Sequence, residues 1–198
     1  MEGAFGVELE RWLRSGEAQT FGDMGDAFAE KGFAVTALLL MSLPALPLPT
    51  GGITHVFEAV TVLVGAEMVL GRRTLWLPRR LRQRPLGPLL TNRALPAIVR
   101  LVRWFERHSR RRMASLFAHR LAIRVLGLVI IGFALAAALA PPFSGLDTFP
   151  ALGVVGVAMA IVLEDVLVLA IGLVVGTGGV ALIASLGAAV VHLVGRLF

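Results

Sequence analysis

The sequence has no cysteine among its 198 residues, and only 16% of those residues carry a charged side chain. Without cysteine the chain can form no disulfide, no zinc–thiolate site and no thiol nucleophile. An ordinary soluble domain is about half apolar and about a quarter charged, whereas this chain is 57% hydrophobic with a mean hydropathy of +0.81. The scarcity of charge therefore excludes an ordinary water-exposed globule.

Charged residues are missing from three long stretches of the chain. None occurs in the 26 residues between Lys31 and Glu58, in the 22 between Arg124 and Asp147, or in the 30 that precede Arg196. A bilayer core of about 30 Å needs roughly 20 predominantly apolar residues in a helix. The stretches are continuously apolar, without the alternating polarity of barrel strands. We therefore expect an all-α, polytopic membrane protein, and its acidic beginning gives no sign of a secretory leader.

Basic residues are concentrated in one connection between apolar stretches. Of the 19 basic residues, 15 lie between Gly71 and Arg124, with Glu106 as the one acid among them. The positive-inside rule places such a connection in the cytoplasm, so we expect residues 72–120 on that side of the membrane. Within it, residues 96–113 predict a basic amphipathic helix that lies on anionic lipid rather than on nucleic acid. The arginines expected to bind the membrane surface are Arg100, Arg103, Arg107, Arg110, Arg111 and Arg112.

Proline and glycine divide the rest of the chain. Residues 1–31 predict a cytoplasmic amphipathic region, residues 32–71 a first membrane hairpin and residues 121–165 a second one. The residues that mark the two hairpin apices are Pro49, Gly51, Gly52, Pro142 and Gly145. Residues 166–198 form a last apolar segment, which is longer than a bilayer is thick. We expect this segment to break near residues 176–179, and its small residues suit close helix packing within the chain or in a homodimer.

The two hairpins resemble each other. A shift of 93 residues aligns Pro49 with Pro142 and Gly52 with Gly145. Interrupted apolar segments at corresponding positions of two halves point to an internal repeat with a transporter-like binding site. Two ordinary hairpins with similar turn chemistry remain the alternative interpretation.

Glu58 is the most informative polar residue. An ionisable group within an apolar helix is costly and is a functional candidate by default. Thr54, Glu58 and Thr61 fall on one helix face, and His55 lies beside them. The alternative is a carboxylate near the headgroups that His55 or Thr54 hydrogen-bonds. The complete candidate ion or solute site comprises Glu58, Thr54, His55, Thr61, Asp147 and Thr148.

Two other acidic residues have structural interpretations. Asp147 stands where the second returning helix begins, and an N-cap is favoured over a ligand role there. Glu67 lies half a helical turn away from the Glu58 face, within reach of Arg72, so we expect an ion pair. No P-loop, no Gly-x-Ser-x-Gly motif and no metal-ligand spacing occurs. We therefore expect no catalytic residue, metal or cofactor; an enzyme acting on lipid-linked sugars is the least favoured alternative.

Several motifs carry a resemblance to a known family. They are FGDMGDAFAEKGF at residues 21–33, LPALPLP at 43–49, EMVLGRRTLWLP at 67–78 and LED at 163–165. Together they resemble the bacterial exopolysaccharide-synthesis family ExoD, although Val166 stands where family members usually have glycine. The resemblance implies an inner-membrane protein that supports exopolysaccharide synthesis or export. Two functions stay open: a non-enzymatic, transporter-like protein, and an accessory or scaffold subunit of the polysaccharide-synthesis machinery.

Overall fold

The computed structural model describes four longer stretches of the chain and several isolated residues before and between them. The described residues are 7, 10–11, 20, 31–46, 53–72, 76, 82–83, 96, 99–100, 102–104, 114–141 and 144–197, with the side chains of the last helix described as far as residue 189. Nearly all of these residues lie in helices, which confirms the predicted all-α fold class. The N-terminal region and most of the basic segment 72–120 lie outside the described residues.

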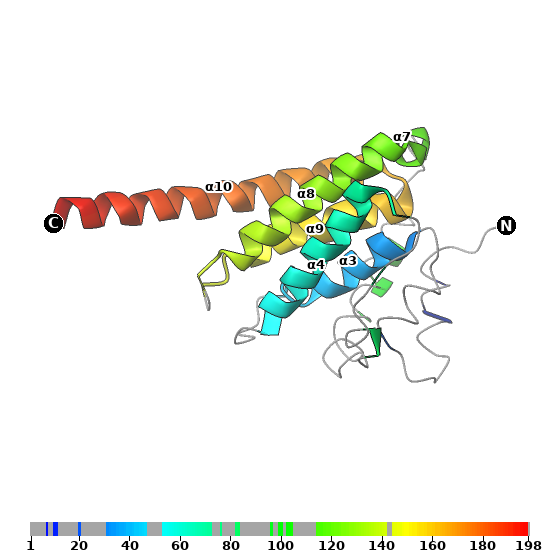
Figure 1. Ribbon diagram of the computed structural model, residues 1–198, viewed down its shortest axis with the longest axis horizontal. Coiled ribbons are helices and arrows are strands. Elements are labelled where there is room, and N and C mark those ends of the chain that lie inside the picture. Colours follow the sequence, from blue (N-terminus) through cyan, green and yellow to red (C-terminus); the bar gives the residue numbers. More distant parts are fainter. Residues whose placement is uncertain are drawn as a thin grey trace.

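Six helices of the described residues are arranged as a bundle with one long projecting helix (Figure 1). They are α3 (Gly32–Ser42), α4 (Ile53–Leu70), α7 (Ala114–Ala118), α8 (Arg120–Ala138), α9 (Thr148–Leu163) and α10 (Val166–Leu197). We call α3 and α4 the first helix pair, and α8 and α9 the second helix pair. The end of α3 and the beginning of α4 lie at the same end of the bundle as the end of α8 and the beginning of α9. We call this the apical end, and the opposite end the basal end.

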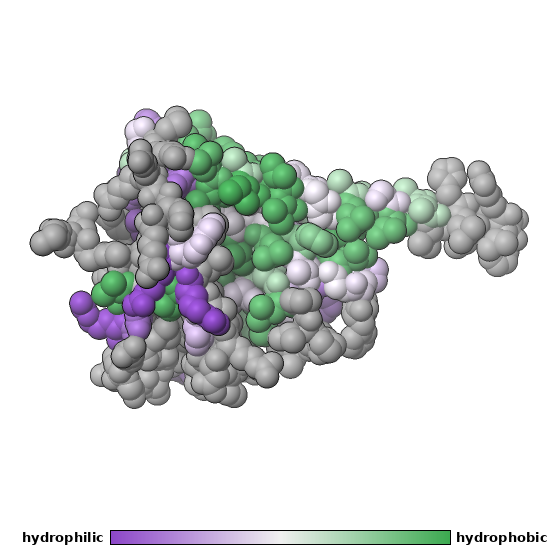
Figure 2. Space-filling view, turned by 180° about the vertical axis from the view of Figure 1, so that it is seen from behind, coloured by the Kyte–Doolittle hydropathy of each residue, from purple (hydrophilic) through white to green (hydrophobic). Residues whose placement is uncertain are grey.

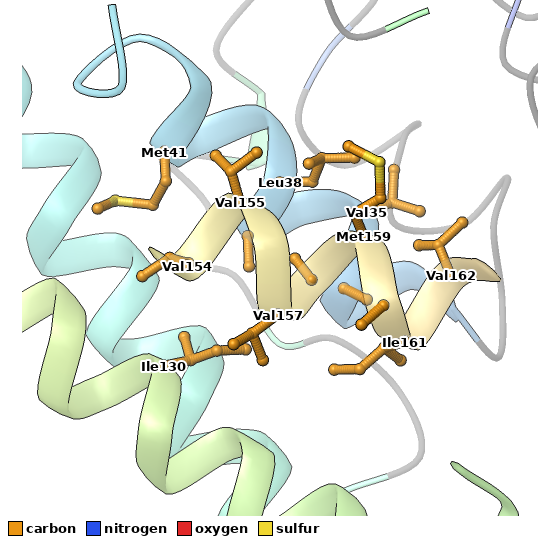
Figure 3. Packing of buried hydrophobic residues seen from close by; sticks show 14 of the residues in the cluster. Val35, Leu38, Met41, Ile130, Val154, Val155, Val157, Met159, Ile161 and Val162 are labelled. Atoms are coloured by element: carbon orange, nitrogen blue, oxygen red, sulfur yellow. The ribbon is translucent and has the colours of Figure 1, made fainter. Parts of the chain in front are cut away.

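The centre of the bundle is formed by α3 and α9. All 11 residues of α3 are buried, because the helix is apolar on every face and α4 and α9 pack against it. A helix that is hydrophobic all round belongs in the interior. Val35, Leu38 and Met41 of α3 lie against α9, and Ile130 of α8 reaches the same core (Figure 3). The core therefore joins the two helix pairs into one bundle.

Backbone geometry explains where α4 and α9 end. Gly71 has φ +70, its N–H donates to the Met68 carbonyl at 3.0 Å, and the next N–H donates to the Glu67 carbonyl at 3.1 Å. These paired bonds form a Schellman motif, which places glycine in the left-handed conformation. At the end of α9 the corresponding left-handed residue is Glu164, with φ 55. Asp165 follows and accepts a hydrogen bond from the Leu167 N–H at 2.8 Å, so α10 begins at once.

The prediction of a break in the last apolar segment is wrong, because α10 continues without interruption for 32 residues through Gly176 to Gly179. Gly176 and Gly179 serve close packing with the neighbouring helices instead. A Cβ on Gly153 of α9 would lie 2.4 Å from the Cα of Gly176, and a Cβ on Gly179 would meet Pro150. Absent side chains let two helix backbones approach closely. Contact with α9 thus supports α10 at the residues where the sequence suggested a turn.

Two helices are long and apolar enough to cross a membrane by length and composition. They comprise Arg120–Leu139, with 20 residues, and Val166–Ala189, with 24 residues, among the part of the chain that the structure describes. On the face seen in Figure 2, green, hydrophobic side chains lie over the middle of the bundle and along part of the projecting helix α10, and purple, hydrophilic ones gather toward one end.

Candidate functional site

Glu58 lies one and a half turns into α4, with its side chain completely buried. Thr54 and Thr61, one turn away on either side, are also buried, while Val56 on another face is 48% exposed. Residues spaced by three or four positions share one helix face, and this face of α4 turns inward. The structure therefore brings Thr54, Glu58 and Thr61 together in the bundle, as their spacing indicates.

His55 connects the buried carboxylate to the surface. Its Nδ1 lies 2.7 Å from Oε2 of Glu58, and its own side chain is 44% exposed. The pair therefore runs from the interior of the bundle to its outside near the apical end. Thr61 takes no part in it, because its hydroxyl donates to the Phe57 carbonyl at 2.8 Å. A threonine bonded to its own helix in this way has less capacity to bind a ligand.

The second oxygen of Glu58 has no partner. Among the described residues, only Oε1 of Glu58 and Oγ1 of Thr36 are buried side-chain polar atoms without a hydrogen bond. Buried polar groups are normally hydrogen-bonded, so each exception calls for an explanation. Thr36 lies six residues before the end of α3 and Glu58 five residues after the beginning of α4, which gives them similar depths from the apical end. The sequence analysis missed Thr36, whose one signal was a hydroxyl within an otherwise apolar helix.

Asp147 lies in the connection between α8 and α9, directly before α9. Its charge influences Glu58 less than burial and His55 do. The predicted N-cap role of Asp147 is wrong, because its side chain makes no capping hydrogen bond. An N-cap residue needs an extended backbone, whereas Asp147 has the helical angles φ −62 and ψ −27. Thr148, the first residue of α9, is half-buried beside it.

Glu67 forms the expected ion pair at the basal end of α4. Its Oε1 lies 3.4 Å from a guanidinium nitrogen of Arg72, and its Oε2 accepts a hydrogen bond from the Trp76 backbone N–H at 2.9 Å. The side chain is only 3% exposed. Glu67 therefore holds the chain that leaves α4 against the helix end, and both of its oxygens are bonded.

The predicted apex and surface residues are described only in part. Gly145 has φ +69, a left-handed conformation that glycine adopts without steric cost. Arg103 forms an ion pair with Glu10, and Arg100 donates to the Pro96 carbonyl at 3.4 Å. The residues outside the described part are Pro49, Gly51, Gly52, Pro142, Arg107, Arg110, Arg111 and Arg112. Within the described part, no group of three or more His, Asp or Glu side chains could hold a metal ion.

Fold and site together define a helical protein with a buried carboxylate paired to a half-exposed histidine and two helices of membrane-spanning length and composition. The chain belongs to the ExoD exopolysaccharide-synthesis family, which matches residues 6–185. This membership implies a role in exopolysaccharide synthesis. It also confirms the resemblance that the motifs carry.

A curated relative is an uncharacterised protein of Synechocystis sp. (strain PCC 6803), 25% identical over 150 residues. The match covers 75% of this chain and 66% of the relative, so the chain spans about two thirds of the relative's length. No solved structure matches the chain.

Proposed function

We propose that this chain is a multi-pass protein of a bacterial inner membrane and that it supports exopolysaccharide synthesis or export. Exposure of the apolar helices supports the membrane assignment. Only 33% of the apolar window of α8 and 28% of that of α10 are buried, whereas the core helix of a soluble protein would be mostly buried. Soluble monomers rarely expose contiguous apolar patches larger than a few hundred Å². Lipid is therefore the environment that suits this surface.

The proposed orientation follows from the distribution of charge. Residues 72–120, with most of the arginines, connect α4 to α8 at the basal end, which the positive-inside rule assigns to the cytoplasm. The apical end then faces the opposite side of the membrane. In this orientation both helix pairs enter from the cytoplasm and turn back at their apices.

The arrangement of the helices supports the proposed internal repeat. The 93-residue shift maps α3 onto α8 and α4 onto α9. If a two-fold operation relates the pairs, a contact between α4 and α8 requires a matching contact between α9 and α3, and both contacts occur. Repeat interfaces are the usual place for substrate and ion sites in secondary transporters. Glu58 lies near the beginning of α4 and Asp147 directly precedes α9, so both lie toward the apical end of the bundle.

One observation carries the proposed mechanism: Glu58 is fully buried, is joined to the half-exposed His55, and has one oxygen without a hydrogen-bond partner among the described residues. A carboxylate inside a membrane helix marks ion and proton pathways. The free oxygen can take a proton, a cation or a polar group of a solute, and His55 links that position to the apical surface. We therefore propose a transporter-like, non-enzymatic activity centred on Glu58.

The test uses two carboxylates of one helix that are buried alike. Glu58→Gln and the matched control Glu67→Gln are each expressed in a strain that lacks the chromosomal gene, and secreted polysaccharide is measured. Each variant is also reconstituted in liposomes, where proton, sodium and potassium uptake is followed. Glu58→Gln should abolish both polysaccharide output and ion uptake, while Glu67→Gln should retain them. Equal uptake by wild type and Glu58→Gln would remove Glu58 from the mechanism.

The second candidate function is that of an accessory or scaffold subunit without transport activity. It is favoured by α10, which extends past the other helices (Figure 1) and exposes Leu182 and Leu186. A scaffold predicts that Glu58→Gln leaves polysaccharide output unchanged. Reversing the charges of Arg107, Arg110, Arg111 and Arg112 should then disrupt assembly with the polysaccharide-synthesis machinery, measured by co-purification.

A further inference from the structure

A hollow lies at the basal end of the bundle, away from Glu58. It is a cavity of about 660 Å³ between the beginnings of α3 and α8 and the ends of α4 and α9. Small-molecule sites in proteins are typically about 300–1,000 Å³, so the cavity is large enough for a ligand. Its lining residues are Lys31, Phe33, Ala34, Met68, Gly71, Arg72, Ala114, Ser115, Phe117, Ala118, Arg120, Ile123, Ile161 and Glu164.

Positive charge dominates the polar part of this cavity. Lys31, Arg72 and Arg120 line it, against the single carboxylate of Glu164. Arg124 adds a fourth cation at the wall, because its guanidinium lies 3.0 Å from the position of a Cβ on Gly71. Lys31 is bound by Glu164 at 3.0 Å and Arg72 by Glu67. Within the described part of the chain, no carboxylate pairs with Arg120 or Arg124.

Two helix N-termini face the same space. α3 begins after Lys31 and α8 after His119, and neither helix has a side-chain cap or an acidic residue in its first turn. The first N–H groups of a helix lack partners within it, and the helix dipole favours an anion there. Together with the guanidinium groups of Arg120 and Arg124, which pair with none of the described carboxylates, these ends form a surface suited to a phosphate group.

The rest of the cavity wall is apolar. Phe33, Met68, Phe117, Ile123 and Ile161 contribute side chains from four helices and the short α7. A free inorganic anion would gain nothing from such a wall, whereas a hydrocarbon chain attached to a phosphate would bury apolar surface against it. We propose that the basal cavity binds a phosphate group carried by an amphiphile, with Arg120 and Arg124 on the phosphate and the apolar wall on the chain.

Glu164 should weaken the binding of the phosphate group. Its carboxylate accepts a hydrogen bond from the Lys31 ammonium, which also donates to the Val162 carbonyl at 2.7 Å. Replacing Glu164 by glutamine removes the one negative charge of the cavity and leaves Lys31 available to the ligand. Binding should then become stronger, a change that a purely structural role of Glu164 would not produce.

The experiment measures calorimetric binding of three probes to the purified full chain in phosphatidylcholine nanodiscs. The probes are dioctanoyl phosphatidic acid, dioctanoylglycerol and inorganic phosphate. Phosphatidic acid should bind, and the two partial probes should bind at least tenfold more weakly. Arg120→Gln should weaken the binding of phosphatidic acid about tenfold, which corresponds to about 1.4 kcal/mol, and Glu164→Gln should strengthen it about threefold. The control is Arg11→Gln, which changes an exposed arginine outside the cavity lining.

Each probe decides a part of the proposal. Equal affinity for inorganic phosphate and phosphatidic acid would assign the site to the free anion and overturn the role of the apolar wall. Equal affinity for dioctanoylglycerol would overturn the phosphate site. The same loss in Arg11→Gln as in Arg120→Gln would show general attraction to a basic protein and would also overturn it. Because the cavity and Glu58 lie at different ends of α4, none of these results depends on ion uptake.

Discussion

Gly156 of α9 and Gly172 of α10 leave no room for a side chain between them. A Cβ built on Gly156 would lie 2.5 Å from the Cα of Gly172, and one on Gly172 would lie 2.8 Å from the Gly156 carbonyl carbon. Because the nearest atoms belong to the backbone, relief of such a clash requires the helices to separate. This contact explains how α10 is held along α9.

Gly172→Ala should therefore destabilise the protein. Overpacking a tight contact typically costs about 1–3 kcal/mol, and the resulting fall in melting temperature can be measured by circular dichroism of the detergent-solubilised protein. Gly178→Ala is the matched control on the same helix, with nothing within 4 Å of the added Cβ. The control should be neutral or gain up to about 1 kcal/mol from helix propensity. Equal melting temperatures for the two variants would contradict the close contact.

The pair of His55 and Glu58 predicts non-additive stability. His55→Ala removes the one described partner of a buried carboxylate, and leaving a buried polar group unsatisfied costs about 1–3 kcal/mol, or more for a charged one. When Glu58 is already glutamine, the same His55→Ala change should cost much less. A thermal-unfolding double-mutant cycle measures the difference. Additive effects of the two substitutions would show that the pair is not coupled.

The contribution of Glu67 to protein stability should depend on its hydrogen-bond acceptor more than on its charge. Glu67→Ala leaves the Trp76 N–H without its partner and should cost about 1–3 kcal/mol. Glu67→Gln keeps an acceptor oxygen for that N–H and loses only the ion pair with the half-exposed Arg72, worth at most about 1 kcal/mol. Chemical denaturation should rank the alanine variant as clearly the less stable. A larger loss of stability in Glu67→Gln than in Glu67→Ala would show that the ion pair with Arg72 is the more important interaction.

The proposed orientation predicts the accessibility of introduced cysteines. Ser144→Cys lies at the apical end and Ser115→Cys at the basal end, both at exposed positions, and the chain has no cysteine of its own to interfere. In intact cells, after the outer membrane is made permeable, an impermeant maleimide should label only Ser144→Cys. In inverted inner-membrane vesicles the same reagent should label only Ser115→Cys. The reverse pattern would overturn the orientation.

The sequence by itself determined the helical class and the family. Uncharged stretches of more than 20 residues leave few alternatives to apolar helices, and the motifs around residues 21–33 and 67–78 are specific enough to indicate ExoD. It also placed Thr54, Glu58 and Thr61 on one face and paired Glu67 with Arg72. These are local relationships, set by helix periodicity and by separations of a few residues along one chain segment.

Only the tertiary structure decided what each polar or small residue contacts across helices. The glycines at 176–179 look like a break in the sequence, but packing against α9 stabilises a continuous helix there, and a glycine's role depends on whether a neighbour fills the space beside it. Asp147 has the right residue type for an N-cap but not the backbone angles. The basal cavity joins Lys31, Arg72, Arg120 and Glu164, which are far apart in sequence. Long-range contacts of this kind depend on how whole helices pack, so no local pattern reveals them.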